Sequence, residues 1–261
     1  MPQISPHERL TATIRNASSE HGVALVAYIT AGYPKKNDFI KTLRAVAEAA
    51  DVVEVGVPFS DPMADGVTIQ RASHAAIAAG VSLRWILDEL KRAGEMSAPV
   101  VLMSYLNPLL AFGYDQLADA ARASNVSGFI VPDLPVEEAG DLGARLDSRG
   151  LALVNLVTPS TPPERMQKLC AASRGFVYAV TTKGTTGGSR ALPTDVVAYL
   201  DRVRAVSPIP VCAGFGVRTS EQVRGLSGHA DGVIVGSALV EELEAGNAVT
   251  GFLNGLRSRR H

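Results

Sequence analysis

The stretch "VVEVGVPFSDPMADGVTIQRAS", residues Val52 to Ser73, has the pattern of a buried strand, a loop and the start of a helix. A short run rich in valine is typical of a strand that is buried on both faces. The loop that follows is rich in Pro, Asp and Gly, which favour turns. Glu54 lies inside the valine run, and a carboxylate in that position requires a physical explanation.

The same pattern of apolar run, turn and helical segment recurs along the whole chain. Near-continuous apolar strands that alternate with helices predict a parallel sheet covered on both faces. Eight such units are typical of a single (β/α)8 TIM barrel, here expected over residues 1–261 with an extra helix at the N-terminus. The predicted strands are Ala24–Thr30, Val52–Val57, Val100–Ser104, Gly128–Val131, Leu151–Val157, Gly175–Val180, Ile209–Ala213 and Gly232–Val235.

Helix-start signals accompany these runs. "SPHE", Ser5 to Glu8, has the form of a capping box with proline at the first helical position. "TPPE", Thr161 to Glu164, repeats this form, and further starts are expected at Thr219–Glu221 and Leu192–Asp195. A doubly wound open sheet is the alternative architecture. It is disfavoured because "TAGYP", after the first predicted strand, lacks the glycine fingerprint of that fold.

The amino-acid composition argues against several classes of function. The formal net charge of −1 gives no basic footprint for nucleic acid. No apolar run reaches the ~18 residues of a membrane helix, and the N-terminus lacks a signal-peptide core. Cys170 and Cys212 have no metal or redox spacing, so we expect buried thiols in a reducing cytoplasm. The scattered histidines predict no metal site.

Candidate catalytic groups follow the second predicted strand. Barrel active sites lie at the C-terminal ends of the strands. Burial would raise the pKa of the Glu54 carboxyl toward neutrality, which suits a group that gives and takes a proton. The alternative is a structural carboxylate that is hydrogen-bonded to a neighbouring hydroxyl. Asp65 supplies a second carboxylate on the next loop, although Asp in "ADGV" is also a common turn residue.

The last two predicted strands carry the pattern of a phosphate site. Gly214 and Gly216 separate a strand from a helix, and Gly236–Ser237 follows the final strand directly. Main-chain N–H groups at a helix start bind phosphate, and barrels commonly hold phosphate at these two loops. Tight turns would explain either glycine pair alone, but they explain the coincidence of both less well.

The loop after the sixth predicted strand, Thr181 to Leu192, contains three glycines and four threonines. Such a loop suits a lid or a phosphate nest. Tyr178 precedes it, as either a core tyrosine or one that faces a ligand. A phosphate-binding site beside a carboxyl of raised pKa indicates acid–base chemistry on a small organic phosphate. This chemistry would be either isomerisation or retro-aldol cleavage.

At the level of motifs, the sequence resembles the tryptophan synthase alpha subunit family over essentially its whole length. The resemblance is carried by "VEVGVPFSDPMADG", "PDLPVEEA", "GFG" and "GSALV". It implies a lyase that cleaves indole-3-glycerol phosphate to indole and glyceraldehyde 3-phosphate in tryptophan biosynthesis. It also implies that Glu54 protonates the indole C3 and that Asp65 accepts a hydrogen bond from the indole N–H.

The remaining site residues come from the same resemblance. Tyr178 would pack beside Glu54, and Thr186 matches a residue of the lid. The phosphate would be held by Gly187, Phe215, Gly216, Gly236 and Ser237. The indole pocket would be lined by Tyr28, Ile69, Met103 and Ile130.

The family's partner is a beta subunit that carries pyridoxal phosphate, so the resemblance implies no cofactor on this chain. An alpha2beta2 tetramer is expected. The partner would dock on Pro58–Gly66, Asn107–Pro108 and Pro132–Glu138.

This chain departs from the family pattern in the loop "TTKGTTGG", where the family commonly has Gly-Val-Thr-Gly. Three alternatives stay open. The chain could be a stand-alone lyase that releases free indole, or a non-catalytic regulator of the beta chain. Lys183 could also form a Schiff base, although a solvated loop lysine is the favoured interpretation of that residue.

Overall fold

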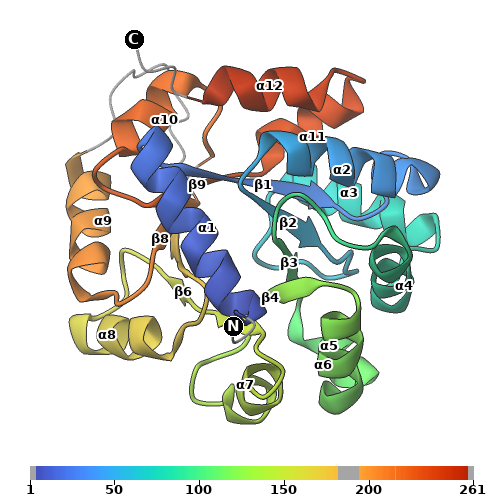
Figure 1. Cartoon of the computed structure of the whole chain (residues 1–261), viewed down its shortest axis with the longest axis horizontal. Coiled ribbons are helices and arrows are strands. Elements are labelled where there is room, and N and C mark those ends of the chain that lie inside the picture. The colour runs from blue at the N-terminus through green and yellow to red at the C-terminus, as the bar shows by residue number, and fades with distance from the viewer. Residues whose placement is uncertain (1–3, 182–193, 215, 258–261) are drawn as a thin grey trace.

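Parallel strands form a ring that is surrounded by helices (Figure 1). The computed structural model describes residues 4–181, 194–214 and 216–257. Every pairing between neighbouring strands is parallel, as the sequence predicts. The strands are β1 Ala24–Thr30, β2 Val52–Gly56, β3 Val100–Met103, β4 Val126–Ile130, β5 Ala152–Val154, β6 Leu156–Val157, β7 Val177–Val180, β8 Val211–Gly214 and β9 Gly232–Val235.

The ring closes through a strand that is split in two. The strand order is β5-β4-β3-β2-β1-β9-β8-β7-β6, so β5 and β6 stand at its two ends. Only Asn155 separates β5 from β6 along the chain, and together they correspond to the single strand predicted at Leu151–Val157. The Asn155 N–H donates to the Ser173 hydroxyl at 3.0 Å instead of to a strand neighbour. The fold is therefore the predicted (β/α)8 barrel, with one strand interrupted at Asn155.

Helices cover the outside of this ring (Figure 1). Among the described residues, no helix is long and apolar enough to cross a membrane. The helices are α1 Pro6–His21, α2 Phe39–Ala49, α3 Val67–Ala78, α4 Leu83–Ala93, α5 Leu106–Phe112, α6 Tyr114–Ala123, α7 Gly140–Asp147, α8 Pro163–Ala172, α9 Thr194–Val206, α10 Ser220–Leu226, α11 Ser237–Glu244 and α12 Val249–Leu256, with a 3-10 turn at Lys36–Asp38.

The additional N-terminal helix α1 closes one mouth of the barrel. Its capping box between Ser5 and Glu8 forms as predicted. Leu10 and Ile14 of α1 are fully buried in the same cluster as the barrel residue Phe176. Because α1 occupies the end where the strands begin, the open end is the one where they finish.

One predicted helix cap was wrong. Thr161 does not cap α8, which begins at Pro163 and has Pro162 at its N-cap position without a side-chain hydrogen bond. The Thr161 hydroxyl instead accepts from the Thr158 N–H at 2.9 Å. The threonine therefore stabilises the turn before the helix. Thr219 forms the predicted cap of α10, whereas Leu192 and Pro193 lie outside the described residues.

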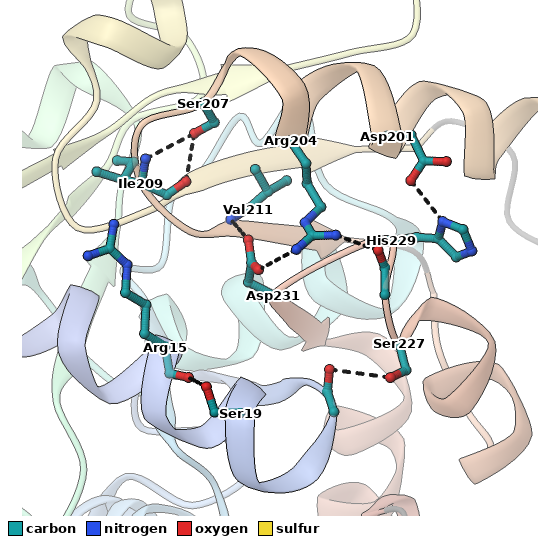
Figure 2. Close-up of polar contacts among 12 residues, drawn as sticks. Arg15, Ser19, Asp201, Arg204, Ser207, Ile209, Val211, Ser227, His229 and Asp231 are labelled. Carbon is teal, nitrogen blue, oxygen red and sulfur yellow. Dashed lines mark hydrogen bonds and ion pairs between the residues drawn. The ribbon is translucent and has the colours of Figure 1, made fainter.

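Aspartates fasten the strands at the closed end. Asp231, just before β9, accepts a 2.8 Å hydrogen bond from the first N–H of β8, that of Val211, and binds Arg204 (Figure 2). Asp51, just before β2, accepts in the same way from Leu25 of β1 at 2.7 Å. In each case a carboxylate satisfies a strand N–H that has no ladder partner, so this end of the barrel serves stability.

Candidate active site

A cavity of about 220 Å³ lies at the open end of the barrel. Its walls come from the ends of the strands and from the loops that follow them, which is where a barrel places its chemistry. The lining residues are Tyr28, Glu54, Ala64, Asp65, Gly66, Ile69, Met103, Pro132, Leu156, Tyr178, Val180, Gly214, Gly216, Ile234, Gly236 and Ser237.

Strand alternation explains why Glu54 lies inside the valine run. Val53 and Val55 pack outward with the helices, whereas Val52 belongs to the barrel interior. Glu54 shares the face of Val52, because alternate residues of a strand point the same way. It lies beside Tyr28 of β1 in the strand register, and its side chain reaches the cavity.

The Glu54 carboxyl is buried without compensation. The residue is 1% exposed, and its Oε2 has no hydrogen-bond partner among the described residues. Burial, with a smaller contribution from the charge of Asp65, raises the pKa of Glu54 to about 8. The structural alternative required a hydrogen bond to a neighbouring hydroxyl, and Oε2 forms none in the described part of the chain. The carboxyl is therefore protonated at neutral pH and free to transfer its proton.

Asp65 lines the same cavity and is held by Tyr105. The Tyr105 hydroxyl accepts from the Ala64 N–H at 2.8 Å and also hydrogen-bonds to the Asp65 carboxylate. Burial raises the pKa of Asp65, and the Tyr105 hydrogen bond opposes that rise. Burial likewise raises the pKa of Tyr105 to about 12, so this hydroxyl keeps its proton.

Further contacts hold the loop that carries Asp65. The Gln70 amide donates to the carbonyl of Asp65 at 2.9 Å and to that of Pro62 at 3.3 Å. The Tyr105 ring stacks on Phe59 with a centroid distance of 5.0 Å. The loop therefore has a defined shape that presents the Asp65 carboxylate to the cavity.

Two tyrosines fit against glycines of neighbouring strands. A Cβ on Gly56 would lie 2.1 Å from the Tyr28 hydroxyl, and a Cβ on Gly214 would lie 2.5 Å from the Tyr178 ring. Burial raises the pKa of Tyr178, and the nearby Glu54 carboxyl raises it further. Both hydroxyls are therefore neutral, and both rings shape the cavity beside Glu54.

The lining of the same cavity includes Gly216, Gly236 and Ser237, three of the predicted phosphate residues. Gly216 has a φ of 64°, a conformation that favours glycine. Gly236 and Ser237 stand at the start of α11. Within the described part of the chain, the N–H groups of Ser237 and Ala238 have no main-chain acceptor, as is normal in a first helical turn. These N–H groups suit an anion. The predicted residues Thr186, Gly187 and Phe215 lie outside the described residues.

Three of the four predicted indole-pocket residues line the cavity, namely Tyr28, Ile69 and Met103. Ile130 does not. It is fully buried in the barrel interior, where Met103 packs against the same cluster. We therefore expect Ile130 to act through Met103 rather than by touching a ligand.

Sequence reasoning missed Tyr105 and Gln70. Tyr105 follows β3 in "SYLNP", so its position after a strand end was the available signal. Gln70 lies on the polar side of α3, where no pattern distinguishes it from a solvent-exposed residue. The described residues contain no group of three side chains able to hold a metal ion.

A family model for the tryptophan synthase alpha chain matches residues 14–254 of this sequence. The chain belongs to the tryptophan synthase alpha chain family. As a member, it is a carbon–carbon lyase of tryptophan biosynthesis that cleaves indole-3-glycerol phosphate. The family works with a beta subunit, which is the partner that depends on pyridoxal phosphate.

Individual relatives of the tryptophan synthase alpha chain family agree over nearly the full length. The alpha chain of Nitratidesulfovibrio vulgaris is 44% identical, covering 96% of this chain and 98% of its own. A tryptophan synthase structure from Mycobacterium tuberculosis is 38% identical with a TM-score of 0.86, covering 95% of this chain and 96% of that one. The alpha subunit from Legionella pneumophila is 33% identical with a TM-score of 0.85, covering 95% and 97%.

Proposed function

We propose that Glu54 and Asp65 together perform the retro-aldol cleavage of indole-3-glycerol phosphate in this chain. The observation that carries the proposal is the buried Glu54 carboxyl, with its Oε2 unpaired among the described residues and its pKa near 8. A protein has no structural reason to keep such a group in its core, because an unpaired buried polar atom is destabilising. It is the group expected of a general acid.

In this reaction, protons move only between the Glu54 carboxyl and the substrate. Glu54 gives its proton to C3 of the indole ring, which loses its aromaticity and gains positive charge at the ring nitrogen. Asp65, as a carboxylate, accepts a hydrogen bond from the indole N–H and stabilises that charge. Glu54 then takes the proton of the glycerol hydroxyl as the C–C bond breaks. The products are indole and glyceraldehyde 3-phosphate.

The cavity lining offers groups for both parts of this substrate. The N–H groups at Gly216, Gly236 and Ser237 would bind the phosphate. Tyr28, Ile69 and Met103 would contact the indole ring, and Tyr178 would pack beside Glu54. Thr186, Gly187 and Phe215 complete the proposed set as lid and phosphate residues.

We further propose that this chain docks onto a beta subunit in an alpha2beta2 tetramer, with pyridoxal phosphate held only by the partner. Apolar side chains are exposed on or near the expected docking segments: Met63 is 86% exposed, Val67 77% and Leu110 51%. Such exposure is typical of an interaction surface. The cytoplasm is the proposed compartment, since Cys170 and Cys212 are free thiols.

Indole release from indole-3-glycerol phosphate tests this function, measured with the chain alone and with a beta subunit added. We expect slow release that rises sharply with the partner, together with a sedimentation velocity mass equal to two copies of each chain. Fast release without a partner would identify a stand-alone lyase. Absence of release in both assays would contradict the catalytic role of Glu54.

A further inference from the structure

The two loops of the proposed phosphate site are joined by an ion pair outside the cavity. Arg218 lies two residues after Gly216, on the loop between β8 and α10. Glu241 lies one turn after Ser237 on α11. The Arg218 guanidinium donates two hydrogen bonds to the Glu241 carboxylate, Nη1 to Oε2 at 2.7 Å and Nη2 to Oε1 at 3.0 Å. This two-point geometry fixes orientation as well as distance.

Both partners of this pair are themselves held. The main-chain N–H of Arg218 donates to the Gln222 side chain at 2.8 Å, which attaches the loop to the start of α10. Glu241 also accepts a 3.3 Å hydrogen bond from Thr68 on α3, the neighbour of the cavity residue Ile69. The Arg218 hydrogen bonds hold the pKa of Glu241 below its usual range. The carboxylate therefore stays charged at every pH at which the enzyme would be assayed.

We propose that Arg218 and Glu241 are positioning residues, which set the spacing between the Gly216 loop and the first turn of α11 and so tune the affinity for the substrate phosphate. This inference rests on the proposed phosphate site. Neither side chain lines the cavity, so neither is a catalytic residue. A phosphate bound by N–H groups from two loops requires both loops at the correct separation, and small displacements weaken such sites.

The solvent exposure of this ion pair allows a positioning role to be distinguished from a contribution to stability. The side chains of Arg218 and Glu241 are 55% and 38% exposed, and ion pairs of that exposure contribute little to the free energy of unfolding. Their removal should therefore leave the melting temperature almost unchanged. The effect should appear in the binding of the phosphate group, because only the relative position of the two loops changes.

A matched control pair exists on the same helix. Arg71 of α3 binds Glu244 of α11 with hydrogen bonds of 2.9 and 2.6 Å. This second pair is also two-pointed and partly exposed, but it does not involve the Gly216 loop. Arg71→Gln therefore removes an equivalent ion pair without releasing the phosphate loop.

The test uses the reverse reaction of the full chain, in which indole and glyceraldehyde 3-phosphate combine. Arg218→Gln and Glu241→Gln should each raise the KM for glyceraldehyde 3-phosphate three- to fivefold. The KM for indole and the kcat should stay within twofold of the unmodified chain. Arg71→Gln should change none of these constants, and the exchanged double variant Arg218→Glu with Glu241→Arg should recover part of the affinity.

Glu241→Gln distinguishes positioning from a direct charge effect. Removing this carboxylate makes the phosphate side more positive, so direct attraction by Arg218 predicts a lower KM for glyceraldehyde 3-phosphate. Positioning predicts a higher one. A lower or unchanged KM in Glu241→Gln, or an equal rise in Arg71→Gln, would overturn the inference. Failure of the proposed function would appear differently, as a lack of cleavage in the unmodified chain.

Discussion

A single buried carboxyl connects the sequence of this chain to its chemistry. Strand alternation turns Glu54 into the barrel while its valine neighbours face the helices. The group then loses water and gains no hydrogen bond at Oε2 from the described residues. Its pKa of about 8 follows from that environment, chiefly from burial and secondarily from Asp65.

Glu54→Gln should lower kcat by a factor on the order of 10³ or more, because glutamine keeps the shape but has no proton to transfer. Substrate affinity should change little, since the phosphate and indole contacts remain. Single-turnover assays and equilibrium binding of indole-3-glycerol phosphate measure the two quantities. Substantial turnover in this variant would show that another group is the acid.

The same substitution should change how stability depends on pH. Unfolded Glu54 releases its proton near pH 4.5, whereas the folded chain holds it to about pH 8. The folded state therefore binds more protons over that interval, and the free energy of unfolding falls as pH rises through it. Glutamine does not titrate. The stability difference in favour of Glu54→Gln should grow by about 3 kcal/mol between about pH 5 and 8.

Urea unfolding of both proteins across that range measures the difference directly. The variant also serves as the control for every other titrating group in the chain. A constant difference would mean that Glu54 has an ordinary pKa in the folded state.

Tyr105→Phe should shift the acidic limb of the kcat/KM profile to higher pH. The hydroxyl hydrogen bond lowers the pKa of Asp65, so its loss allows burial to raise that pKa further. Activity near neutrality should fall on the order of tenfold, as expected for one hydrogen bond to a charged group. The phenyl ring retains the stacking on Phe59, and an unchanged acidic limb would show that Tyr105 does not act on Asp65.

At the scale of elements, the two ends of the strands have different tasks. The open ends carry the cavity, whereas the closed ends carry aspartates that satisfy strand N–H groups. Loops at the open end are shaped by contacts such as those of Gln70 and Tyr105 with the loop that holds Asp65. Stability and catalysis are therefore separated along the barrel axis.

Asp231→Ala tests this separation. The change leaves the buried N–H of Val211 without its acceptor, which should lower the free energy of unfolding by about 1–3 kcal/mol. Thermal unfolding measures that loss, and kcat should be unchanged below the transition. Asp201→Ala is a suitable control, because within the described residues Asp201 pairs only with His229 on the surface nearby (Figure 2). It should alter stability by less than about 1 kcal/mol.

At the scale of the whole molecule, the barrel itself could be predicted from local pattern. The apolar runs, their turns and the helical segments between them each depend on residues close together in the chain. The predicted strands at Ala24–Thr30 and Gly232–Val235 match β1 and β9 at both ends, and the others differ mainly at their boundaries. The split at Asn155 was not predicted, because apolar residues flank Asn155 on both sides.

The candidate site divides in the same way. Glu54 and the glycines before α11 are visible in sequence, because an acid in a valine run and glycines after strands are local anomalies. Tyr105 and the Arg218–Glu241 pair are not, since they derive their roles from partners on other elements. Thr161 is the opposite case. Its local pattern predicts a helix cap, but its hydroxyl accepts a hydrogen bond from the N–H of Thr158 instead.

The sequence by itself therefore determined the order of strands and helices, the enclosing barrel and the presence of an acid in its second strand. Only the tertiary structure decided that Glu54 faces the cavity with an unpaired oxygen among the described residues, and that Asp65 is held by a tyrosine from the loop after β3. The physical reason is that hydrophobic periodicity is a property of neighbouring residues. Burial, pKa and hydrogen-bond satisfaction depend on groups that the fold brings together from distant parts of the chain.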